Sequence, residues 1–185
     1  MQWQVMLFDT TVGEAEIEAV AKVLASRWLS MGSITAAFEQ EFAQSLNVPE
    51  AVAVSSGTAA LHVAVLALGL GPGDEVIIPS LSFVASAAVV TMSGAQPIFA
   101  DIKGPEDLTM DPEDLEMRIT SRTKAIVVMH YGGYACDMKS ILALAHKYNL
   151  IVIEDAAHAP LVRTDAGNWA PWGILVVSAS LLPKT

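Results

Sequence analysis

Cysteine and charge are both scarce in this sequence of 185 residues. Cys136 is the single cysteine, so no disulfide framework can form, and a reducing compartment, the cytoplasm, is the expected location. Charged residues make up only 16% of the chain, and the net charge of −10 at pH 7 argues against nucleic acid and anionic membranes as partners. The start, MQWQVMLFDT, lacks the basic segment and apolar core of a signal peptide. The most apolar region, AVAVSSGTAALHVAVLALGLG, is interrupted by polar residues, so we expect no membrane span.

Hydrophobic residues, in contrast, make up 53% of the chain. Short, nearly continuous apolar runs alternate with stretches of helical pattern, as in parallel strands covered by helices on both faces. This alternation predicts one three-layer α/β domain with a mainly parallel, mixed sheet. The expected strands are residues 51–55, 75–80, 96–102, 125–131 and 150–156, and the expected helices are residues 14–26, 35–45, 58–68, 82–92, 111–118 and 137–148.

The stretch AVAVSSGTAALHVAVLAL joins a predicted strand to a predicted helix through a small polar turn. Such a turn can present the backbone N–H groups of Gly57, Thr58 and Ala59 at a helix start, where they lack helical partners and the helix dipole favours an anion. Ser56 and Thr58 could add hydroxyl donors. An ordinary helix capped by its own Ser or Thr would have the same sequence.

The stretch LIVIEDAAHAP ends a predicted buried strand with Glu154 and Asp155, and His158 follows. Open α/β sheets bind ligands at the carboxyl ends of their strands. Asp155 could there bind a metal, a ribose or a protonated ring nitrogen, and His158 could face the same ligand. The alternative is a helix-capping Asp and a structural histidine. A metal site is disfavoured, because His130, His146 and His158 show no ligand spacing with a second His or Cys.

Two further stretches contain the ends of predicted strands, and so lie at the same carboxyl edge of the expected sheet. PSLSFVASAAVV places Phe83 where its ring could stack on a planar ligand, although a lone Phe is more often part of a core. MHYGG places His130 and Tyr131 nearby, either as ligand contacts or as a hydrogen-bonded structural pair. An anion site, an aromatic ring and an Asp–His pair together suit one planar, phosphorylated, nitrogen-containing ring. Pyridoxal phosphate fits that description.

These stretches are similar to the N-terminal half of the DegT/StrS-type sugar aminotransferases, pyridoxal phosphate enzymes of fold type I. The motifs that carry the resemblance span the chain from about Phe8 to Gly173, in the order of the family. They are SRWLSMGSITAAFEQEFA, VAVSSGTAALHVAVLALGLGPGDEVIIPSLSFVASA, GAQPIFADI, TKAIVVMHYGGYACDM and VIEDAAHA. The resemblance implies that residues 1–173 form part of the large, cofactor-binding domain.

The resemblance also implies residue roles. Gly57 and Thr58 would bind the cofactor phosphate, Phe83 would stack on the pyridine ring, Asp155 would keep the ring nitrogen protonated, and His158 would lie beside the phenolic oxygen. The segment WLSMG would line the substrate entrance at a dimer interface, since the full-length family is homodimeric. One departure occurs next to it, because an arginine at position 27 stands where the family usually has glycine. A sugar-nucleotide substrate and an amino-acid donor are the implied partners.

The family's essential lysine follows the last of these strands, in a segment that runs roughly D-I-G-C-F-S-F-F-A-T-K-N-M. Here ILVVSASLLPKT follows WG, and only Lys184 agrees, at the expected count. Codons exist for Gly173 to Thr185 that give the family segment when read from the third base of the glycine codon, with a stop after Thr185. We therefore expect residues 174–185 to be an out-of-frame tail, caused by loss of one base at Gly173. The position of Lys184 within that tail puts its catalytic role in doubt.

Three functions remain open at this point. The first is an aminotransferase of keto-sugar nucleotides, for polysaccharide or amino-sugar biosynthesis, of which this chain is an inactive fragment. The second is a sugar dehydratase or lyase of the same fold, which uses histidine in place of the lysine. The third is a non-enzymatic fragment that dimerises with a full-length relative. The lysine in the reconstructed frame favours the transferase.

Overall fold

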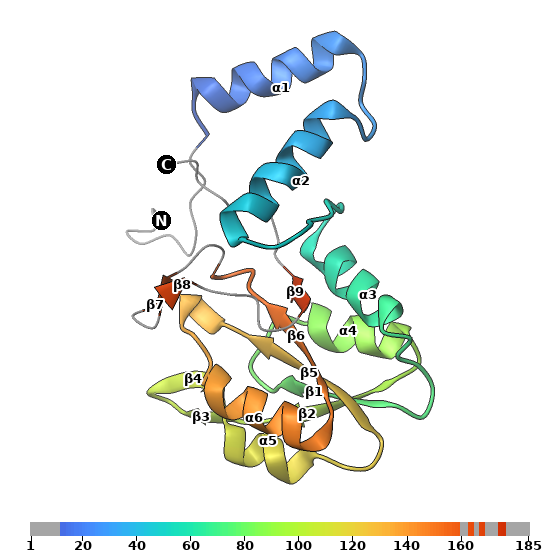
Figure 1. Cartoon of the computed structure of the whole chain (residues 1–185), viewed down its shortest axis with the longest axis vertical. Helices are drawn as coiled ribbons and strands as arrows, with labels where there is room; N and C mark the ends of the chain where they lie inside the picture. Colours follow the sequence, from blue (N-terminus) through green and yellow to red (C-terminus); the bar gives the residue numbers. More distant parts are fainter. Residues whose placement is uncertain (1–11, 160–162, 165–166, 169–173, 177–185) are drawn as a thin grey trace, which may run out of the picture.

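The centre of the molecule is a five-stranded sheet in which every neighbouring pair of strands is parallel (Figure 1). The computed structural model describes residues 12–159, 163–164, 167–168 and 174–176. The apolar runs of the sequence form these strands, and β1 and most of β5 are buried throughout, as expected for strands covered on both faces. The strand order is β2 (Gln96–Ala100), β1 (Glu75–Pro79), β5 (Thr123–Met129), β6 (Ile151–Asp155) and β9 (Ile174–Val176).

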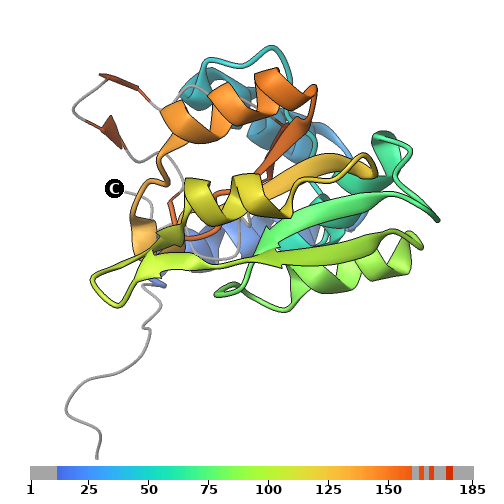
Figure 2. The ribbon, with the colours of Figure 1, turned by 90° about the horizontal axis from the view of Figure 1, so that it is seen from below.

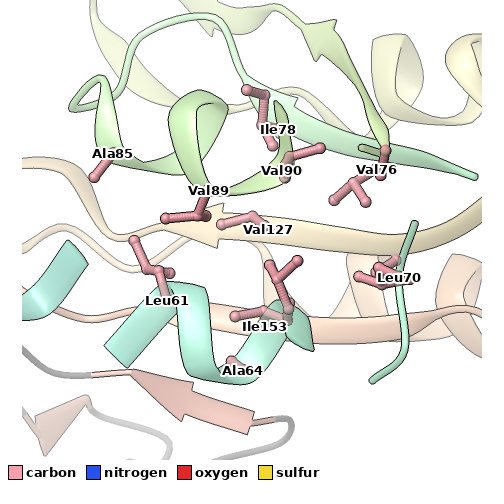
Figure 3. Close-up of a cluster of buried hydrophobic side chains, with 13 residues drawn as sticks. Leu61, Ala64, Leu70, Val76, Ile78, Ala85, Val89, Val90, Val127 and Ile153 are labelled. Carbon is pink, nitrogen blue, oxygen red and sulfur yellow. The ribbon is translucent and has the colours of Figure 1, made fainter. Parts of the chain in front are cut away.

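Helices cover both faces of this sheet, which confirms the predicted three-layer arrangement. One core cluster joins α3 (Gly57–Ala67) and α4 (Ala85–Met92) to the sheet (Figure 3). A second core cluster joins α5 (Pro112–Arg118) and α6 (Met138–Tyr148) to the other face. Figure 2 shows the sheet from its edge, with α5 and α6 on one side and α4 on the other. The alternation of side chains along each strand therefore assigns every strand residue to one of two helical layers.

Local sequence signals explain where several helices begin. Asp111 caps α5 by accepting a hydrogen bond from the N–H of Glu113, and Pro112 occupies the first helical position. Asp137 caps α6 in the same way through the N–H of Ser140. Both starts lie within one residue of the expected boundary.

The two N-terminal helices, α1 (Glu14–Ser26) and α2 (Ser33–Leu46), lie beyond one end of the sheet (Figure 1). No residue of α1 is buried, and only Ala43 and Leu46 of α2 are buried. Large apolar side chains on this pair and on the loop between its helices are exposed to solvent. They include Ile17, Val20, Leu24, Trp28, Leu29, Met31 and Ile34.

The remaining elements are small. An antiparallel pair, β3 (Ile102–Gly104) and β4 (Asp107–Met110), follows β2, and the turn signal Gly-Pro between them could have predicted it. A second antiparallel pair is β7 (Arg163–Thr164) with β8 (Gly167–Asn168), and a short helix, η1, spans Tyr131–Gly133. In the part of the chain that the structure describes, no helix is long and apolar enough to cross a bilayer.

The prediction of a strand at residues 51–55 is wrong. This segment forms no strand, and it pairs with none of the strands that the structure describes. The backbone N–H of Ala53 instead donates to the Glu39 carboxylate at 2.8 Å, and Val52 is 74% exposed. A β-rich run becomes a strand only where a neighbouring strand completes its hydrogen bonds, and local sequence cannot show whether one is there.

Candidate functional site

The carboxyl edge of the sheet contains the point where the strand order reverses. From β1 the chain passes through α4 to β2 on one side, and from β2 it passes through α5 to β5 on the other side of β1. In doubly wound sheets such a reversal opens a crevice at the carboxyl ends of the two strands on either side of it, here β1 and β5, and ligands bind there. Phe83 follows β1, His130 follows β5, and Asp155 ends β6, so the predicted residues lie along this edge.

Asp155 lies on the face of the sheet that α3 covers. Ile153, two residues earlier in β6, belongs to the same core cluster as Leu61 of α3, and side chains two apart share a face. In Figure 3, α3 runs from Leu61, near the arrowhead of β5, back to Ala64, so the start of the helix faces the carboxyl edge. Gly57 lies about 6 Å further along the helix than Leu61, and Asp155 about 6.6 Å further along the strand than Ile153. The start of α3 and the Asp155 carboxylate therefore both lie toward the carboxyl edge, on the same face of the sheet.

The start of α3 has room for an anion. Ser56 caps the helix, and its Oγ accepts a hydrogen bond from the N–H of Ala59 at 3.1 Å. Within the described residues, no group accepts a hydrogen bond from the N–H of Gly57 or of Thr58. Ser56 and Thr58 are exposed. The capped-helix alternative thus accounts for one of these three N–H groups and leaves two for a ligand.

Phe83 is not a core residue, because its side chain is 64% exposed in the loop between β1 and α4. The hydroxyl of its neighbour Ser82 donates to Sδ of Met129 at a distance of 3.2 Å. Met129 is the register partner of Asp155 in the parallel pairing of β5 and β6. The loop that carries Phe83 therefore contacts the residue next to Asp155, and the ring is free to cover a planar ligand at this edge.

The Asp155 carboxylate is buried, with 5% of the residue exposed. Its Oδ1 accepts a hydrogen bond from the N–H of Ala157 at 3.1 Å. Loss of solvent raises the pKa of Asp155 above its ordinary value, and the Ala157 N–H and the nearby rings of His158 and His130 only partly oppose this. A cation placed beside this carboxylate would offset its desolvation, as a protonated ring nitrogen does.

His158 is exposed, and the backbone N–H of Gly132 donates to its Nδ1 at 3.2 Å. The ring also meets Tyr131 edge to face, with the ring centres 5.7 Å apart. The helix-capping alternative for Asp155 does not hold, because no helix begins after β6 in the described residues.

His130, in contrast, is fully buried on the opposite face. Its Nε2 lies 3.5 Å from Oε2 of Glu154, and its Nδ1 accepts a hydrogen bond from the N–H of Cys136. Burial raises the pKa of the Cys136 thiol to about 11, so the thiol keeps its proton at neutral pH and is a poor nucleophile. His130 is therefore a structural residue, with Glu154 and Cys136 as partners, while Tyr131, its expected partner, contacts His158. The pairing of His130 with Glu154 over 24 positions had no local signal in the sequence.

The prediction for Lys184 lies outside the residues that the structure describes, as does most of the predicted out-of-frame tail. Residues 174–176 do lie within them, as β9, and leave the frame prediction untested. In the described residues, no three His, Cys, Asp or Glu side chains are grouped so that they could hold a metal ion.

Fold and geometry together define a doubly wound α/β protein whose candidate ligand site lies at the carboxyl ends of the strands. Comparison with known proteins makes this class specific. Residues 10–167 match the DegT/DnrJ/EryC1/StrS aminotransferase family, and the chain belongs to that family.

Three examples show how the chain compares with proteins of known sequence or structure. It is 49% identical to the spore coat polysaccharide biosynthesis protein SpsC of Bacillus subtilis (strain 168), over 80% of this chain and 38% of SpsC. It is 37% identical to the aminotransferase TlmJ from Streptoalloteichus hindustanus, with a TM-score of 0.82 over 92% of this chain and 47% of TlmJ. The PLP-form of the putative sugar aminotransferase Spr1654 from Streptococcus pneumoniae is 30% identical, with a TM-score of 0.78 over 85% of this chain and 44% of that one. The chain thus spans less than half the length of these relatives.

Proposed function

We propose that this chain supplies the cofactor-binding part of a pyridoxal phosphate-dependent sugar aminotransferase. The reaction would pass the amino group of an amino-acid donor to a keto-sugar nucleotide, for polysaccharide or amino-sugar biosynthesis. The observation that carries the proposal is the buried Asp155 carboxylate, which faces the same layer as the open start of α3. An anion site and a buried anion on one face suit a ligand with a phosphate at one end and a cationic ring atom at the other.

Each residue then has a distinct task. The N–H groups of Gly57 and Thr58 bind the phosphate, Asp155 holds a proton on the ring nitrogen, and the exposed Phe83 covers one face of the ring. His158 lies beside the ring oxygen. When bound, pyridoxal phosphate supplies an electron sink for cleaving bonds at the carbon that carries the amine. Asp155 makes that sink effective, because the proton it retains keeps the ring nitrogen positive.

Two further parts of the proposal rest on the resemblance and on the length of the relatives. Transfer of the amine needs a lysine to move a proton, and Lys184 stands at the expected count. We propose that the chain alone has little or no turnover, because it spans less than half of its relatives. We also propose that the full protein is a homodimer, which the exposed apolar side chains of α1 and its following loop support.

Binding of pyridoxal phosphate to the purified chain, measured by equilibrium dialysis, tests the cofactor site. We expect saturable binding that Thr58→Ala weakens several-fold, because it removes a hydroxyl donor to the phosphate and leaves the N–H groups of Gly57 and Thr58 in place. Asp155→Asn should weaken binding through the ring. Asp137→Asn, at the capped start of α6, is the matched control and should bind like the unmodified chain. Equal affinity of all four proteins would contradict the assigned site.

The activity needs a second experiment. The nucleotide sequence at the codon for Gly173 shows whether a base has been lost, and a chain with that base restored can be assayed with amino donors and keto-sugar nucleotides. We expect transaminase activity that is lost when the restored lysine is replaced. An early stop in the restored frame, or a product that acts on the sugar without an amino donor, would overturn the proposed function.

A further inference from the structure

The loop after β5, residues 131–136, donates one backbone N–H to each of two histidines. The N–H of Gly132 donates to Nδ1 of His158, and the N–H of Cys136 donates to Nδ1 of His130, each at 3.2 Å. The two rings differ in burial, since His130 is fully buried and His158 is exposed. One short loop thus contacts a structural histidine and a candidate ligand-binding histidine through the same ring atom.

A backbone N–H can only donate, so the ring nitrogen that receives it carries no proton. In a neutral imidazole the other nitrogen must then carry the proton. We propose that the 131–136 loop fixes His158 as the neutral tautomer with its proton on Nε2, and that His130 is the positioning residue that sets the loop. His158 then offers a hydrogen-bond donor to an acceptor oxygen of the ligand.

His130 fixes both ends of the loop. Its own backbone N–H donates to the carbonyl of Asp155 at 3.2 Å, which holds the start of the loop against the end of β6. Its Nδ1 receives the Cys136 N–H, and the Cys136 thiol donates to the Met129 carbonyl at 3.2 Å, so the end of the loop returns to β5. On its far side the ring places Nε2 3.5 Å from the Glu154 carboxylate.

Two glycines give the loop the shape that the contact with His158 needs. Gly132 and Gly133 have φ values of 63° and 87°, in the left-handed region that side chains rarely adopt. A Cβ on Gly133 would lie 3.2 Å from the carbonyl oxygen of His158, closer than most such contacts. The loop can therefore approach the backbone of His158 closely enough for the Gly132 N–H to reach the ring.

The tautomer itself does not depend on any cofactor, but its use rests on the proposed function. A deprotonated ring oxygen accepts hydrogen bonds and cannot donate them, so only the tautomer with Nε2–H complements it. The opposite tautomer would place two acceptors against each other. The loop thus makes His158 selective for an acceptor at this position.

Nitrogen-15 NMR of the cofactor-free chain at about pH 8.5, above the ordinary histidine pKa of about 6.5, tests the tautomer directly. The four histidine rings can be assigned by single substitutions, of which His146→Asn, at an exposed position of α6, also serves as the control. We expect His158 to show an unprotonated Nδ1 and a protonated Nε2, with a scalar coupling between Nδ1 and the Gly132 amide nitrogen. A protonated Nδ1, or the averaged signals of a freely exchanging ring, would overturn the proposal.

Two substitutions of His130 test its positioning role. His130→Asn keeps an acceptor near the place of Nδ1 for the Cys136 N–H, and we expect the His158 signals and the coupling to Gly132 to persist. His130→Leu removes the acceptor, and we expect the coupling to be lost and the His158 signals to move toward a mixture of tautomers. Unchanged His158 signals in a folded His130→Leu protein would remove His130 from the proposal. If the unmodified chain shows the expected His158 tautomer but does not bind pyridoxal phosphate, that result would count against the proposed function alone.

Discussion

Glu154 and Asp155 are consecutive, buried carboxylates that end β6 on opposite faces of the sheet. Glu154 faces His130, while Asp155 shares its face with Ile153 and the start of α3. The period of two along a strand separates them, so one supports the fold and the other is directed to the candidate site. Because their environments differ, we expect substitutions of the two carboxylates to have different effects.

Asp155→Asn should stabilise the cofactor-free protein at neutral pH. Because burial raises the pKa of Asp155, the folded protein holds this proton more tightly than the unfolded chain, and stability falls as pH rises through the folded pKa. Asparagine keeps an acceptor for the Ala157 N–H and carries no charge to desolvate. The gain should therefore be present at pH 7 and vanish as the pH falls below the ordinary aspartate value, as measured by urea unfolding at both pH values.

Asp114→Asn is the control with the opposite sign. The side chain of Arg118, and then the N–H of Asp101, hold the pKa of Asp114 below its ordinary value. Its charge contributes stability that is present above the ordinary aspartate pKa and is lost as the pH falls through the lowered, folded value. The variant should lose stability at pH 7 and approach the unmodified protein in acid. Parallel pH profiles for the two variants would show that the assigned environments are wrong.

Arg27→Gly should stabilise the protein by about 1 kcal/mol, because Arg27 ends α1 in a left-handed conformation with φ of 61°. Glycine adopts this conformation without a clash of its side chain. Asn149 ends α6 with φ of 53°, and asparagine tolerates that region better than arginine, so Asn149→Gly should gain less. Urea denaturation of both variants measures the difference, and an equal or larger gain at Asn149 would contradict this account.

Ser56→Ala should cost about 1 kcal/mol of stability, since the Ser56 hydroxyl caps α3 through the N–H of Ala59. Ser45→Ala is the matched control, because the Ser45 hydroxyl donates to the Glu41 carbonyl within its own helix and caps no helix end. We expect little change for the control. A thermal or urea transition that shifts equally in both variants would show that the loss at Ser56 is not a capping effect.

Local signals predicted much of the fold and less of the site. The periodicity of residues 14–26 gave the bounds of α1, and Asp111 with Pro112 marked the start of α5, because capping and helix pattern depend on neighbouring residues. The segment at residues 51–55 failed because a strand also depends on a distant partner. The exposure of Phe83 and the contact between Gly132 and His158, 26 positions apart, depend on tertiary packing and could not be predicted from the residues around them.

Cys136 should resist thiol reagents in the folded protein. Its pKa of about 11 leaves about one thiolate in a thousand at pH 8, against about a quarter for an ordinary cysteine, and only 4% of the residue is exposed. The thiol also donates to the Met129 carbonyl, which a reagent would have to displace. Labelling with a chromogenic disulfide at pH 8 should therefore proceed only as the protein unfolds, and its rate should rise with urea until it matches that of the denatured chain. Native-state labelling as fast as that of the denatured chain would contradict the burial of Cys136 and, with it, the closed end of the 131–136 loop.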